Sequence, residues 1–242
     1  MGLKERGEVK EPVYFNYIFR FDGGKEHVFK IELDPESLAY LHRKELKGSD
    51  WTRLEFHQCE NCPLDSDSNT NCPVAVSLEE LVEAFRDKFS YEEADIKVET
   101  PDRTYFKKTT MQKGLSSIMG ILMVSSGCPI LDKLRPMVRF HLPWATVLET
   151  TFRTTSTYLL GQFFIKKEGG SPDFSFDGLN EIYKDVRKVN KGMAERIRSM
   201  AGKDAAINAL IILDIFASDI PFSLEDQLEE LRFLFRPYFT KL

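Results

Sequence analysis

The sequence predicts an α+β fold, in which a small antiparallel sheet of two hairpins precedes a mostly helical C-terminal part. Apolar and polar residues alternate along short segments within residues 1–110, and a helical apolar period replaces this alternation from Met111 onward. Strands followed by a run of helices are typical of the α+β class. We therefore expect a strand-bearing part at 1–110, with a cysteine-rich loop at 57–76, and a helical part at 111–242. We expect the two to pack as one compact unit.

Two hairpins account for the predicted sheet. The segment "VYFNYIFRF" (13–21) places every second side chain, from Val13 to Phe21, on one apolar face. Asp22-Gly23-Gly24 then supplies turn residues before the alternation resumes in "HVFKIEL". Pro101-Asp102 supplies a second turn, between "ADIKVET" and "RTYFKKTT". This pattern predicts a sheet that is covered on a single face.

Helix-start signals punctuate the chain and then dominate it. Asp34-Pro35 predicts a short helix through Leu41, because proline is favoured at the first helical position. Ser77 with Glu80, and Ser223 with Asp226, have the spacing of capping boxes that open helices. Breaks after Met111 are expected at glycine and proline positions, namely Gly127–Pro129, Pro143, Gly169–Pro172, Gly202 and Pro221.

The composition favours a soluble cytoplasmic protein. Hydrophobic residues make up 42% of the 242 positions and charged residues 29%, which is ordinary globular usage. The net charge of −5 argues against nucleic acid as a partner. The charged start "MGLKERGEVKEP" lacks the apolar core of a secretory signal, and the apolar run at 114–126 is too short to span a membrane. We expect no membrane association and leave open an unknown protein partner.

The densest chemistry lies in "HQCENCPLDSDSNTNCPVAV" (57–76). Cys59 and Cys62 form a C-x2-C step, and Cys72 follows closely enough to return to it. Cys128 and His57 compete for a fourth position. Three thiolates with one imidazole, or four thiolates, suit tetrahedral zinc, and four thiolates also suit an iron–sulfur cluster. A reducing cytosol makes such a cluster of cysteines a metal site more readily than a disulfide framework.

Proline follows three of these cysteines, at Cys62, Cys72 and Cys128. A similar cysteine-proline step closes the bacterial ferredoxin-type run of cysteines. This similarity favours an iron–sulfur cluster more strongly than the cysteine spacing alone does. Two other interpretations stay open. The cysteines could serve as small buried hydrophobes, or Cys59 and Cys62 could form a regulatory disulfide. We predict a cysteine-ligated metal centre, either zinc or iron–sulfur, with a binding, sensing or structural role.

The runs "LEFHQCENCPLD" (54–65) and "SSGCPILDKLRPMVRFHLPWAT" (125–146) resemble an uncharacterised family of single-domain bacterial proteins. The resemblance covers nearly the whole chain. It implies a bacterial cytosolic origin and carries no activity. Because both runs contain cysteines, it is compatible with Cys128 joining the other three.

Two alternative functions rest on other residues. An enzyme could use His141 or Asp214 as acid–base groups in a pocket between the sheet and the helices. An interaction module could use the basic face of the predicted helix at 178–200, where Lys184, Arg187 and Lys191 gather. A solvated face opposite an apolar stripe is the favoured explanation of those lysines and arginines.

Overall fold

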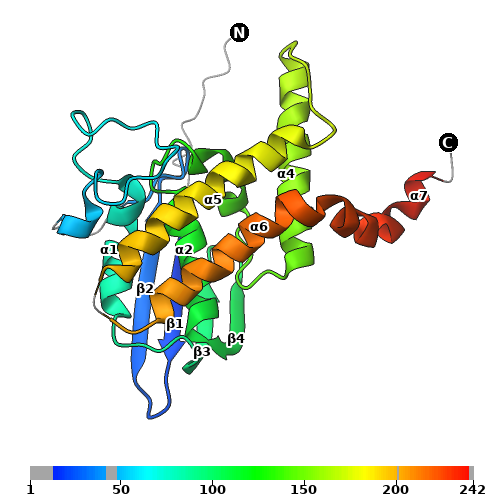
Figure 1. Ribbon diagram of the computed structural model, residues 1–242. Helices are drawn as coiled ribbons and strands as arrows, with labels where there is room; N and C mark the ends of the chain where they lie inside the picture. Colours follow the sequence, from blue (N-terminus) through cyan, green and yellow to red (C-terminus); the bar gives the residue numbers. More distant parts are fainter. Residues whose placement is uncertain (1–12, 42–47, 201, 240–242) are drawn as a thin grey trace, which may run out of the picture.

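The structure is a computed structural model that describes residues 13–41, 48–200 and 202–239. The charged segment at 1–12, used above for the expected localisation, lies outside these residues. Figure 1 shows a sheet, a helical layer against it, and two long helices crossing on the far side of that layer. The class is α+β, as the sequence predicts.

The sheet has four antiparallel strands in the order β2-β1-β3-β4. Its first hairpin joins β1 (Val13–Arg20) to β2 (Glu26–Leu33), and its second joins β3 (Glu93–Glu99) to β4 (Thr104–Thr110). Both predicted hairpins are confirmed. In register, Tyr17 faces Phe29 across the first pair, and Phe19 faces Ile96 across the β1–β3 pair.

Only one face of the sheet is covered by helices. Alternate residues of β1, from Val13 to Phe19, are buried and the residues between them are not. Helix α2 (Met111–Val124) crosses this buried face at Gly114, where a Cβ atom would lie 2.8 Å from the Phe19 ring. The close approach therefore requires glycine. Phe85 packs beside α2, with its ring 4.9 Å from that of Phe19.

Helices make up most of the remaining regular structure in the described residues. Helices α5 (Asp177–Arg198) and α6 (Ala205–Leu231) pack against each other, and α6 also packs on α2. In Figure 1, α4 and the end of α6 project away from the body of the molecule. The remaining elements are η1 (Asp50–Thr52), α1 (Pro73–Ala84), η2 (Leu131–Leu134), α3 (Arg135–Arg139), α4 (Val147–Lys167), η3 (Arg232–Phe235) and α7 (Arg236–Phe239).

Two predicted helix starts are wrong for local reasons. After Asp34 the chain makes a turn instead of a helix, because the Asp34 carboxylate accepts the backbone N–H groups of Glu36 and Ser37. Tyr40 then bridges back to the end of β2. Helix α1 begins at Pro73 and not at Ser77, because Cys72 is its N-cap and proline takes the first helical position.

The predicted break at Pro221 is a kink inside α6. Ser223 has non-helical backbone angles (φ −132°), yet the helix continues to Leu231. The Ser223 hydroxyl donates to the Asp219 carbonyl and accepts from the Gln227 side chain, which supports the backbone that proline disrupts. Two helical segments therefore meet at Ser223, and α6 spans both of them.

The stretch Ala205–Phe239 is the only one in the described part of the chain that is long and apolar enough to cross a membrane. One third of its most apolar window (33%) is buried against the rest of the protein. This is weak evidence for a span, since the core helix of a globular protein passes the same test.

Candidate metal centre

The cysteine loop is closed at its base. An antiparallel bridge joins Arg53 to Asn71, and the Leu54 N–H donates to the Thr70 carbonyl at 2.9 Å. The Cys72 N–H donates to the Thr52 carbonyl at 2.7 Å. The two ends of the loop therefore meet, and Cys59, Cys62 and Cys72 belong to one compact segment.

The middle of this loop docks on α5. The Cys62 N–H donates to the Cys59 carbonyl at 3.0 Å, which closes the C-x2-C step into a turn. Asn61 donates its side-chain amide to the backbone carbonyl and carboxylate of Asp185, at 3.2 and 3.1 Å. The Cys59 sulfur lies 4.0 Å from the Val189 carbonyl oxygen. One further residue of α5, Gly192, makes this approach possible, since a Cβ atom there would be 2.8 Å from the Cys59 sulfur.

The other two cysteines come from ordered segments of the core. Cys72 is the N-cap of α1, and Cys128 follows α2 after Gly127, whose φ of +89° reverses the chain. Both are buried, whereas Cys59 and Cys62 are partly exposed. The cysteines are all free thiols.

Electrostatic interactions join the four thiols. Burial raises the pKa of Cys59 to about 12, and the charges of the other three cysteines add to this rise. Burial also raises the pKa of Cys128, with further contributions from Cys72 and Cys62. Two segments that are distant in sequence, the loop with Cys59, Cys62 and Cys72 and the turn after α2 with Cys128, thus have their sulfurs within electrostatic reach of one another. However, no three histidine, cysteine or acidic side chains among the residues described stand close enough to hold a single metal ion.

A buried arginine faces this cluster. Arg196 of α5 is 0% exposed, and its guanidinium donates to three carbonyls of the segment that leads into the loop. They belong to Trp51 (2.7 Å), Arg53 (2.7 Å) and Leu54 (2.8 Å). Its Nε has no hydrogen-bond partner within the described structure. Burial lowers the pKa of Arg196, and the charges of Cys72, Cys59 and Cys62 oppose that shift.

The sequence analysis missed Arg196, although its position carried a signal. It lies three residues after Met193 and one before Ile197, which places it on the apolar stripe of the helix. An arginine at such a position must find partners in the interior, because an unpaired buried charge is costly.

The structure does not bring His57 to the thiols. Its backbone has a positive φ (48°), and its ring packs edge-on against Phe56. Its Nδ1 lies 3.4 Å from a carboxylate oxygen of Glu195, and its side chain is 43% exposed. Cys128 is among the groups whose charge contributes to the raised pKa of Cys59, and His57 is not.

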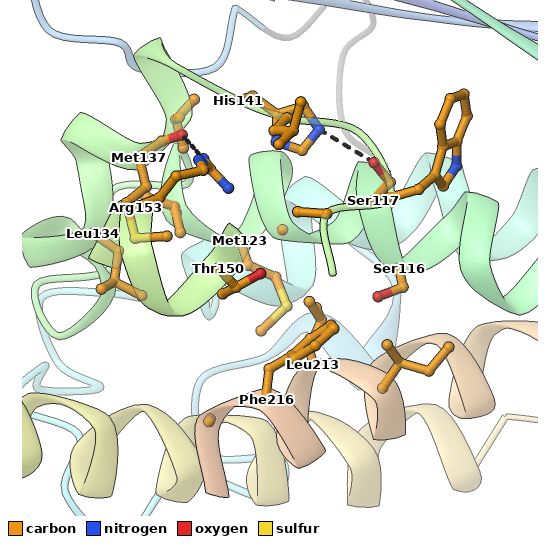
Figure 2. Close-up of a pocket in the computed structure, with 18 of the residues that line it drawn as sticks. Ser116, Ser117, Met123, Leu134, Met137, His141, Thr150, Arg153, Leu213 and Phe216 are labelled. Atoms are coloured by element: carbon orange, nitrogen blue, oxygen red, sulfur yellow. Dashed lines mark hydrogen bonds between the residues drawn. The ribbon is translucent and has the colours of Figure 1, made fainter. Parts of the chain in front are cut away.

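His141 lies elsewhere, in the segment between α3 and α4. Its ring forms a hydrogen-bonded triangle with the side chains of Tyr17 and Ser117. Its Nε2 is 2.9 Å from the Tyr17 hydroxyl and 3.2 Å from the Ser117 hydroxyl, which are 2.7 Å from each other. Figure 2 shows the ring and Ser117 at the wall of a pocket. Burial lowers the pKa of His141 to about 3, with a further contribution from the charge of Arg153. His141 is therefore a neutral side chain at neutral pH.

Asp214, the other residue of the predicted acid–base site, has different neighbours. Its carboxylate accepts a long hydrogen bond from the Asn190 side-chain amide, at 3.5 Å. The Arg187 Nε lies 4.0 Å from the same carboxylate, which is too far for a hydrogen bond. No hydrogen bond or ion pair joins it to His141 in the described regions. The expected basic or amide partner of Asp214 is present, but the two candidate acid–base groups do not meet.

The basic face of α5 is partly neutralised by nearby acidic groups. Three of its cations lie within 4.0 Å of a carboxylate oxygen. The pairs are Lys184 with Glu181 (2.6 Å), Lys188 with Asp185 (3.5 Å) and Arg187 with Asp214 (4.0 Å). Lys191 is exposed and carries none of these pairs. This arrangement is typical of a solvated helix face.

The fold is α+β, and it holds four free thiols within electrostatic reach of one another and a buried guanidinium. A family model, that of a domain of unknown function (DUF6901), matches residues 15–236. The chain belongs to this family. None of the curated proteins and none of the solved structures compared with the chain matches it.

Proposed function

We propose that this protein binds a metal centre through Cys59, Cys62, Cys72 and Cys128. The observation that carries the proposal is that the four thiols of the chain lie within electrostatic reach of one another, and three of them within reach of the buried guanidinium of Arg196. Metal binding would draw these thiols closer together than they stand in this structure.

Charge balance supports a ligated centre. The hydrogen-bond partners of Arg196 in the described residues are three carbonyl dipoles, which carry no net charge. Ligation removes the thiol protons, and four thiolates around Zn²⁺ carry a net charge of about −2. An anionic centre would therefore supply the counter-charge that the buried guanidinium lacks.

The cysteine-proline steps at Cys62, Cys72 and Cys128 favour an iron–sulfur cluster over zinc. A similar step closes the bacterial ferredoxin-type run of cysteines. Four thiolates also suit tetrahedral zinc, which is the alternative centre.

The proposed role is binding, sensing or structural. Cys59 and Cys62 are partly exposed and Cys72 and Cys128 are buried, so one side of the centre would be open to small oxidants or chelators. A centre held between the loop and the core would respond to such reagents by releasing the loop. We also propose a cytoplasmic location, where reducing conditions keep thiols available for metal.

Metal analysis of the full chain purified without air tests the proposal. We expect about four irons and four sulfides per chain, with broad absorbance near 400 nm, for a [4Fe–4S] centre. About one zinc per chain in a colourless protein would show that the cysteines bind zinc instead of an iron–sulfur cluster. Protein that lacks both metals, and that takes up neither zinc nor iron with sulfide, would refute the proposal.

Single substitutions identify the ligands. Replacing each cysteine in turn by serine should lower the bound metal severalfold, including Cys128→Ser, whose position is distant in sequence from the loop. His57→Gln is the matched control, since its ring contacts Glu195 and Phe56 instead of the thiols. If His57→Gln lost its metal and Cys128→Ser retained it, His57 and not Cys128 would be the fourth ligand.

A further inference from the structure

A second candidate site is a pocket on the side of α2 that faces the C-terminal helices. Its volume is about 480 Å³, within the range of about 300–1,000 Å³ that is usual for small-molecule sites. Residues of α2, α4, α5 and α6 line it, together with the segment around α3. No cysteine is among them, so the pocket is separate from the proposed metal centre.

The charged residues of this pocket are all cations. Lys107, Lys113 and Arg153 line it, and no aspartate or glutamate does. This is unexpected in a chain whose net charge is −5. A pocket with positive groups and apolar walls favours an anionic ligand, because low-dielectric walls strengthen the attraction between charges.

Arg153 has unused donors in this pocket. Its one hydrogen-bond partner in the described residues is the Met137 carbonyl, which accepts from a terminal nitrogen at 2.7 Å. The i,i+4 neighbour Glu149 forms no ion pair with it there, since the Glu149 carboxylate instead accepts from the Thr146 N–H and hydroxyl as part of a capping box. A guanidinium has five N–H groups, so several remain for a ligand.

The pocket has a polar end and an apolar end. Figure 2 shows Arg153, His141 and Ser117 on one side, with Leu213 and Phe216 of α6 on the opposite side. The Met123 side chain lies between the two ends and can adapt to a flexible ligand. Such a layout matches an amphipathic molecule with a single charged head.

We infer that this pocket binds a medium-chain aliphatic carboxylate, with the head at Arg153 and the tail against Leu213 and Phe216. A planar guanidinium matches a carboxylate through two parallel hydrogen bonds. At about 30 Å³ for each water-sized group, the cavity holds roughly 16 non-hydrogen atoms. Decanoate, with about a dozen such atoms, fits within this limit.

Isothermal titration of the full chain with three ligands of equal tail length tests the inference. Decanoate should bind more tightly than 1-decanol, and decylamine, which is protonated at pH 7, should bind most weakly. Arg153→Gln should weaken decanoate binding by about ten- to a hundredfold and leave 1-decanol unchanged. Lys191→Gln, which removes an exposed cation of α5, should change neither.

A blocking variant separates the pocket from non-specific binding to exposed phenylalanines. Gly120 lines the pocket in the middle of α2, and a Cβ atom there meets only Leu213, at 3.9 Å. Gly120→Leu should therefore fill the cavity without backbone strain and abolish binding of both decanoate and 1-decanol. Gly161→Leu on the exposed side of α4 is the matched control and should bind both ligands normally. Equal affinity for decanoate and 1-decanol, or full binding by Gly120→Leu, would overturn the inference.

Discussion

Gly192→Ala is the most direct test of how the cysteine loop docks on α5. Gly192 is buried in the middle of a 22-residue helix, and its φ angle is an ordinary helical one. An added Cβ atom would lie 2.8 Å from the Cys59 sulfur and 3.3 Å from the His57 carbonyl oxygen. The sulfur and its loop must then move away from the helix.

Two opposing effects set the magnitude. In a helix interior, alanine is more favourable than glycine by about 0.5–1 kcal/mol. Overpacking against a sulfur and a backbone carbonyl costs about 1–3 kcal/mol. We expect Gly192→Ala to lower the unfolding free energy of the metal-free protein by about 1 kcal/mol. It should also reduce the metal content, because Cys59 is displaced from the other thiols.

Urea unfolding and metal analysis of the same preparations measure both effects. Gly161→Ala is the matched control, since a Cβ atom at Gly161 in α4 meets nothing within 4 Å. It should raise the unfolding free energy by about 0.5–1 kcal/mol and leave the metal content unchanged. If Gly192→Ala were as stabilising as Gly161→Ala and retained its metal, the docking of Cys59 on α5 would be refuted.

Three further outcomes follow from buried groups. Arg196→Met should lower the unfolding free energy by about 3–5 kcal/mol because three buried carbonyls lose charged donors; Arg196→Lys should cost less, and equal losses in urea unfolding would contradict a role for the charge. His141 has its pKa lowered from 6.5 to about 3, so its contribution to stability is complete above pH 6.5 and is lost as the pH falls toward 3. Between pH 6.5 and 3 this group should lower the unfolding free energy by about 1.4 kcal/mol for each pH unit. Unfolding curves at several pH values measure this slope, which should be absent in His141→Gln. The pKa of Cys59 is raised from 9.0 to about 12, so metal-free protein should lose stability as the pH rises from 9 toward 12, and Cys59→Ser should remove that loss.

The sheet was predictable because its signals are local. Apolar and polar residues alternate strictly in β1 and β3. The turns at Asp22-Gly23-Gly24 and Pro101-Asp102 consist of adjacent residues that favour turns. A sheet covered on one face needs no more than this alternation. The wrong helix starts arose where two local signals competed. After Asp34 the carboxylate hydrogen bonds of a turn outweighed the proline signal, and at α1 the proline after Cys72 outweighed the Ser77 capping box.

The candidate site was predictable in its residue types but not in its geometry. The C-x2-C spacing of Cys59 and Cys62 indicates a turn, which the structure confirms with the Cys62-to-Cys59 hydrogen bond. Nothing in the spacing determines where Cys128 lies, because its position depends on how α2 crosses the sheet. The pocket around Arg153 could not be predicted from the sequence either, because it forms only where four helices meet.

The strand order has a consequence for how the chain assembles during synthesis. Central strand β1 is complete at Arg20 and can pair at once with β2, but its other edge waits for β3, which begins only at Glu93. Until the ribosome has released that segment, Asn16 to Arg20 present unsatisfied backbone groups beside an apolar face. Nascent chains of this protein should therefore depend on chaperones, or on slow elongation, over the interval between the two hairpins.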